Sequence, residues 1–305
     1  MQIYPMKKSI VVVFILLLVQ GCFLNRRTKT GRYPTVRNNV CKVLSNKVIF
    51  YAVFVDSKGI HPWSDYDLNS TKDSINKAIN WLENEAKKNS IGLDIEFKYY
   101  SKNDRLPVRG KFKYETLSST LFHFRDIRKG IKSVDDWSDK ISRLVAKGLP
   151  RKKSEQATTK NNMTDRERLI AKLRDLYGTD NIALLFFTNN YFENEMSVAL
   201  HTASDLNTEY AIVSEKRPAV IAHEFLHLFG AEDLYISQFD RGGKSKRKKE
   251  KIMKYFPNEI MAFAYRDIDS LGISPLSKYL IGWDNKLDEN AKGLITRKGQ
   301  KLLEY

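Results

Sequence analysis

The sequence predicts a mixed fold of the α+β class, with α/β-like features, built around one main core. Two apolar segments rich in β-branched and aromatic residues, 48–55 and 182–187, have the composition of buried strands. Amphipathic helical patterns lie between and after them. The composition, 42% hydrophobic and 29% charged, is that of an ordinary globular chain and excludes collagen, coiled coil and wholesale disorder. Two cysteines in 305 residues exclude a disulfide-rich scaffold.

The first 21 residues are typical of an export signal. Lys7 and Lys8 precede an apolar run over residues 10–19, which is too short to span a bilayer core of about 30 Å as a helix but suits a secretory signal. The ending Val-Gln-Gly-Cys resembles a bacterial lipoprotein signal and implies lipidation of Cys22. We therefore expect export and a lipid anchor on a bacterial membrane, in the outer membrane and periplasm or at the cell surface. A buried apolar helix or strand is the alternative.

The elements after this signal are predicted from hydrophobic periodicity and turn residues. The expected helix from about Thr71 has an apolar face, and the helix near Pro218 begins with a proline, which is tolerated in a first turn. The predicted elements are strand 48–55, the helix from Thr71, strands 91–100 and 111–117, interrupted helices over 121–177, strand 182–187, edge strand 209–214, the helix from Pro218 and a C-terminal helix within 273–283. The predicted division is a signal peptide at 1–21, a membrane tether at 22–45, a catalytic domain at 46–284 with a basic, partly helical insertion at about 121–177, and a tail at 285–305.

A His-Glu-x-x-His motif marks the helix after Pro218 as the site of chemistry. His223 and His227 are four residues apart, so they lie on one helix face about 6 Å apart along the axis. That separation lets both imidazoles bind one tetrahedral metal ion. Glu224 is placed to accept a proton from water at that ion without being a ligand. The alternative is a core helix with two satisfied histidines and a surface glutamate.

The residues that follow the motif complete a candidate ligand set. Gly230 permits a sharp exit from the helix. Asp233, three residues later, can then turn back under the ion as the third ligand, and Glu232 is the fallback. The combined pattern predicts one catalytic Zn²⁺ bound by His223, His227 and Asp233.

These residues resemble the zinc signature of the metzincin metalloproteases. His223, Glu224, His227 and Gly230 match that signature directly, whereas position 233 is Asp where most members have His. The resemblance is therefore to the snapalysin-like minority with an aspartate third ligand. It implies a zinc-dependent endopeptidase with a twisted mixed sheet, an active-site helix, a methionine turn and a C-terminal helix.

The resemblance also implies a methionine turn beneath the metal. Met261, in an apolar stretch 28 residues after Asp233, is the candidate, and an ordinary core methionine is the alternative. Some metzincins have a tyrosine two residues after this methionine. Phe263 stands there, so only Tyr265 and Tyr235 remain as possible transition-state donors.

The net charge of +16 bears on partners. Loss of residues 1–21, which contain two lysines and no acid, leaves +14. Residues 241–254 contain eight basic residues and one acid. We predict a loop near the site, which is either a solvated surface or attracts acidic substrates or anionic lipids.

The remaining histidines and the second cysteine carry no functional prediction. His61, His123 and His201 lack the spacing of metal ligands, and no motif surrounds Cys41.

The sequence therefore predicts a membrane-anchored zinc endopeptidase acting on a peptide or protein substrate, with acidic substrates among the candidates. It is expected to be monomeric and not to bind nucleic acid. Extended substrate would add to the edge strand near residues 210–213. The alternatives are a peptidase of narrow specificity, acting on one partner or a cell-wall peptide, and a non-catalytic basic surface lipoprotein used for adhesion.

Overall fold

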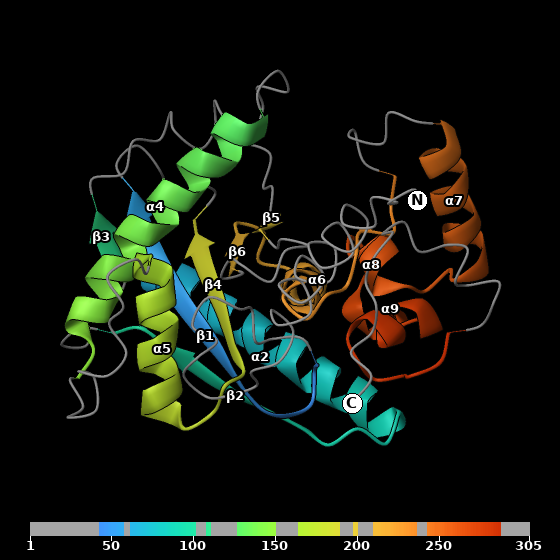
Figure 1. Ribbon diagram of the computed structural model, residues 1–305, viewed down its shortest axis with the longest axis horizontal. Coiled ribbons are helices and arrows are strands. Elements are labelled where there is room, and N and C mark those ends of the chain that lie inside the picture. The colour runs from blue at the N-terminus through green and yellow to red at the C-terminus, as the bar shows by residue number, and fades with distance from the viewer. Residues whose placement is uncertain are drawn as a thin grey trace, which may run out of the picture. The chain divides into compact units, whose positions relative to one another are not determined.

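The computed structural model describes residues 43–57, 62–101, 108–110, 127–150, 164–189, 198–200, 210–236 and 243–287. Its strands form one six-stranded sheet in the order β2-β1-β4-β6-β5, with β3 also paired to β1 (Figure 1). All pairings are parallel except that of β5 with β6. The strands are β1 (Asn46–Ser57), β2 (Leu93–Tyr99), β3 (Val108–Gly110), β4 (Ile182–Thr188), β5 (Val198–Leu200) and β6 (Tyr210–Val213).

Both faces of the central strands are buried, which explains why their sequences are almost continuously apolar. In β1, Phe50 and Phe54 belong to one core, whereas Tyr51 and Val53 belong to the other. Helices α2 (Asp65–Lys88) and α6 (Pro218–His227) contribute to the first core. Helices α4 (Ile127–Gly148) and α5 (Asp165–Tyr177) contribute to the second. The predicted mixed α and β chain with a mixed sheet is confirmed.

Helix α2 has the predicted apolar face but begins six residues before Thr71. Ser64 is its N-cap, and the side chains of Ser64 and Asp67 form a reciprocal capping box. This cap satisfies amide groups that the first turn leaves unpaired. The five residues predicted to face the core, namely Ile75, Ala78, Ile79, Leu82 and Ala86, are all buried.

The prediction that residues 209–214 form an edge strand is wrong in one respect. Strand β6 occupies this segment, but it pairs with β4 on one side and with β5 on the other. Its four residues are at most 1% exposed. The outermost of the described strands on this side is β5, a three-residue strand in a segment that shows no clear alternation.

The prediction that residues 241–254 form a loop is also wrong. Residues Gly243–Tyr255 form helix α7, which fits the good helix propensity of lysine and arginine. Ile252 is 2% exposed and joins the first core, with Met253 packed against it. The helix therefore has an anchored face and a basic face.

The C-terminal part consists of short helices held against the start of β1. These are α8 (Ile260–Phe263), the 3-10 helix η2 (Ile268–Ser270) and α9 (Pro275–Leu280). The backbone amide of Leu44 donates to the Ile281 carbonyl over 2.9 Å, and the Trp283 indole donates to the Leu44 carbonyl. Leu44 and Leu287 are buried in the first core, so the packed region extends slightly beyond 46–284.

Several predictions lie outside the described residues. These are the signal and lipidation site with Cys22, most of the tether with Cys41, the strand at 111–117, the three isolated histidines and most of the tail. Within the described part of the chain, no helix combines the length and apolarity needed to cross a membrane.

Candidate metal centre

Helix α6 carries the His-Glu-x-x-His motif through the first core. Pro218 occupies its first turn, where a missing N–H costs nothing. Eight of its ten residues are buried, including His223, Glu224 and His227. Polar groups at such positions are stable only with partners, so their surroundings define what the site can bind.

The chain leaves α6 through Gly230, as the sequence predicts. Its φ of +101° is a conformation that side-chain-bearing residues rarely adopt, and a Cβ there would lie 3.0 Å from the Leu280 carbonyl oxygen. The Ala231 amide donates back to the Leu226 carbonyl over 3.2 Å. This turn returns the chain toward the helix face that carries both histidines.

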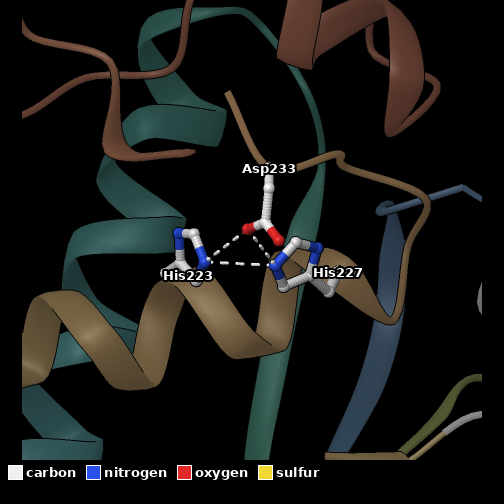
Figure 2. A group of neighbouring side chains, drawn as sticks. All are labelled: His223, His227 and Asp233. Atoms are coloured by element: carbon white, nitrogen blue, oxygen red, sulfur yellow. Dashed lines mark hydrogen bonds and ion pairs between the residues drawn. The ribbon is translucent and has the colours of Figure 1, made fainter. Parts of the chain in front are cut away.

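Asp233 meets the two histidines after this turn. Its Oδ1 lies 3.2 Å from His223 Nε2 and 3.0 Å from His227 Nε2, while the two Nε2 atoms are 3.1 Å apart. Figure 2 shows the three side chains converging, two from α6 and one from the loop beyond it. Among the described residues, these three form a group able to hold a metal ion. Glu232, the fallback ligand, is not part of it.

The other nitrogen of each imidazole faces a backbone carbonyl. His223 Nδ1 is 3.3 Å from the Ile260 oxygen, and His227 Nδ1 is 2.8 Å from the Ala231 oxygen. A carbonyl can only accept, so each contact places a proton on Nδ1 and leaves Nε2 as the nitrogen that faces the cluster. Both Nε2 atoms and the Asp233 carboxylate oxygen therefore converge on one point, where a metal ion can bind all three.

Zinc fits this donor set. Ligands at 2.0–2.1 Å in a tetrahedral arrangement lie about 3.3 Å apart, close to the separations here. Burial alone would raise the pKa of Asp233, but the His227 and His223 rings outweigh it and hold that pKa well below its usual range. The Asp233 side chain is 39% exposed, so one side of the cluster remains open to a ligand.

Glu224 lies beside the cluster without joining it. The residue is 5% exposed, and its Oε2 atom has no hydrogen-bond partner among the described residues. In the metal-free protein, burial raises the pKa of Glu224 to about 8, His227 opposes this shift and Asp233 contributes to it. A carboxyl group beside a metal site is placed to accept a proton from water and to pass it on.

Met261 lies in α8 and is fully buried. The Leu234 amide, next to Asp233, donates to the Met261 carbonyl over 3.0 Å, and the preceding carbonyl, from Ile260, contacts His223 as described above. The backbone at residues 260–261 therefore contacts one helix ligand, His223, and the residue that follows the third ligand, Asp233.

Glu259, the residue just before α8, was not predicted from the sequence to have a role at this site. Its carboxylate is buried and accepts hydrogen bonds from the amides of Met261 and Ser274, at 2.9 and 2.6 Å, and from the Ser277 hydroxyl at 3.0 Å. It caps α8 and ties that helix to the start of α9. Two sequence features could have indicated this role: Glu259 stands at a helix N-cap position before α8, and Ser274-Pro275 marks the start of α9.

The two candidate tyrosines differ in position. The Tyr235 ring lies 6.2 Å from the His223 ring, centroid to centroid, and Tyr235 is 38% exposed. Tyr265 is 61% exposed, packs its ring edge-on to Phe263, and accepts a hydrogen bond at its carbonyl from Arg217. Only Tyr235 is thus placed beside the cluster by a described contact.

Comparison with known proteins adds no relative. No family model, curated protein or solved structure matches this chain. The chemistry of this protein must therefore be inferred from the site itself, a buried His-His-Asp cluster able to hold a metal ion, with a carboxyl group next to it.

Proposed function

We propose that the protein is a metal-dependent hydrolase. The observation that carries this proposal is the convergence of His223 Nε2, His227 Nε2 and Asp233 Oδ1 next to the buried Glu224 carboxyl, whose Oε2 has no hydrogen-bond partner among the described residues. A metal site without catalytic activity would not need that carboxyl, because His223, His227 and Asp233 can bind a metal ion without it.

Within that class, we propose a zinc endopeptidase of the metzincin type with an aspartate third ligand. The order along the chain supports it: strands, the motif helix, a glycine exit, a buried methionine turn and a C-terminal helix. The resemblance to a lipoprotein signal supports anchoring of this enzyme to a bacterial membrane through Cys22.

A bound zinc ion supplies Lewis acidity, which polarises a scissile carbonyl and lowers the pKa of water to about 7. Glu224 accepts the proton of the attacking water at its unbonded Oε2 and passes it to the leaving amine. The Ile260 and Ala231 carbonyls hold the two imidazoles in the orientation and tautomer that ligation needs.

The substrate strand would lie along β5 rather than β6. β6 has partners on both sides, whereas β5 contacts α6 and is the last of the described strands on that side. An extended peptide could pair with its outer side by strand addition.

The test compares wild type with Glu224→Ala on a diverse peptide library, read by mass spectrometry, with zinc content measured in parallel. Asp73→Ala, which removes an exposed carboxylate on α2, is the matched control. We expect cleavage by wild type and Asp73→Ala, and none by Glu224→Ala although it retains zinc. Near-wild-type cleavage by Glu224→Ala would refute the proposed role. A wild type that binds no zinc and cleaves nothing would instead favour a non-catalytic lipoprotein.

A further inference from the structure

We propose that helix α7 is a substrate-recognition surface that selects peptides with acidic side chains near the scissile bond. This inference rests on the proposed function and names the substrate class of the same site. It concerns residues that neither the motif nor the metal cluster explains.

The charge of α7 is strongly one-sided. Its thirteen residues include seven lysines and arginines and one acid, Glu250. Lys246, Lys251 and Lys254 are exposed, and none of the three forms an ion pair with a described carboxylate. Like charges three or four residues apart, such as Lys251 and Lys254, destabilise a helix. An anionic partner would remove that repulsion.

The helix is fixed to the site rather than free. Ile252 is 2% exposed and lies in the same core as α6. Figure 1 shows α7 on the side of α6 away from the sheet, the side that also holds α8 and α9. The positive charges therefore keep a defined position relative to α6.

A short chain of contacts joins this helix to the metal cluster. Lys249 Nζ lies 6.0 Å from the centre of the Tyr235 ring, and that ring lies 6.2 Å from the ring of His223. An extended peptide advances about 3.3 Å per residue. A carboxylate two to four residues from the scissile bond can therefore reach the basic face of α7.

This chain of contacts favours a peptide over a membrane as the partner. A helix that only attracted lipid head groups would not need Lys249 close to the Tyr235 ring, which lies beside the candidate zinc ligand His223. Charged groups along a cleft also raise the local concentration of oppositely charged substrate, and salt weakens that effect.

The experiment compares quenched fluorescent peptides that differ only in having three glutamates or three glutamines, placed on one side or the other of the scissile bond. The α7 variant is the triple substitution Lys246→Gln, Lys249→Gln and Lys251→Gln. The matched control, Lys87→Gln, Lys140→Gln and Lys147→Gln, removes three exposed lysines from α2 and α4.

We expect the ratio of kcat/KM for the Glu peptide over the Gln peptide to fall about eightfold in the α7 variant, because each screened surface pair contributes a factor of about two. The control triple variant should keep the wild-type ratio. In the wild type, 0.5 M NaCl should lower this ratio, because salt screens the charges of α7 and of the peptide. A ratio that the α7 variant leaves unchanged would overturn the proposal.

A binding measurement separates this inference from the proposed activity. Glu224→Ala is titrated with labelled Glu and Gln peptides and followed by fluorescence anisotropy, with and without the α7 substitutions. Preference for the Glu peptide that depends on α7 supports the inference even if nothing is cleaved; equal affinities overturn it. If the α7 substitutions abolish binding to phosphatidylglycerol vesicles but leave the peptide preference unchanged, α7 is a lipid-binding surface and the proposal is overturned.

Discussion

Replacing Glu259 should disturb both the stability of the protein and its metal affinity. This carboxylate lies outside the cluster, yet it caps helix α8, whose Ile260 and Met261 carbonyls contact His223 and Leu234. Glu259→Ala would leave the buried amides of Met261 and Ser274 without acceptors. The Ser277 hydroxyl can rotate toward another partner, so it adds less.

The expected size follows from these contacts. A buried donor left unpaired costs about 1–3 kcal/mol, so two amides and a small cavity give a loss of about 4 kcal/mol for Glu259→Ala. Glu259→Gln keeps one acceptor oxygen but turns an NH₂ group toward a donor, and should lose about 2 kcal/mol. Zinc affinity should fall about tenfold or more, as for groups that orient metal ligands.

Urea unfolding of the metal-free protein, together with zinc titration against a chromophoric chelator, measures both effects. Asp94→Ala, an exposed carboxylate change on β2, is the control and should alter neither. A Glu259→Ala protein within 1 kcal/mol of wild type, with unchanged zinc affinity, would refute the reasoning.

Three further predictions concern the same region. Gly230→Ala should lower the free energy of unfolding by about 2–3 kcal/mol and weaken zinc binding, because a positive φ and the Leu280 oxygen both oppose a Cβ; chemical denaturation and zinc titration check this. In metal-free protein, the folded pKa of Glu224, about 8, exceeds its unfolded value of 4.5. Its stabilising contribution, up to about 5 kcal/mol, is complete below pH 4.5 and lost as pH rises through 8; Glu224→Gln should flatten the curve of stability against pH. Ile252→Ala should cost about 2–4 kcal/mol in a urea titration, whereas the exposed Lys254→Ala should cost under about 0.5 kcal/mol.

Features of the fold and the site could be predicted from the sequence where the spacing of nearby residues determines their geometry. The interval between His223 and His227 places both on one helix face whatever surrounds them, and Gly230 signals the exit that brings Asp233 back. The burial of β1 followed from its continuous apolar, β-branched and aromatic composition, and the apolar face of α2 followed from its helical periodicity.

Features could not be predicted from the sequence where the position of an element or side chain depends on segments far away in the chain. Nothing within residues 210–213 indicates that β5 will cover the outer side of β6, because pairing is a property of two segments. Residues 241–254 were assigned to a loop from their charge, although Ile252 is buried in the first core and Met253 packs against that core. The role of Glu259 depends on donors up to 18 residues away.

The short sequence interval between the three ligands affects how zinc would act on folding. His223, His227 and Asp233 lie within eleven residues, so the unfolded chain can close a loop around a metal ion at little entropic cost. A metal that binds both states stabilises the folded one only by the difference in affinity. Zinc should therefore raise the melting temperature less than its affinity for the folded protein would suggest, and it could be captured by the segment before the sheet has formed.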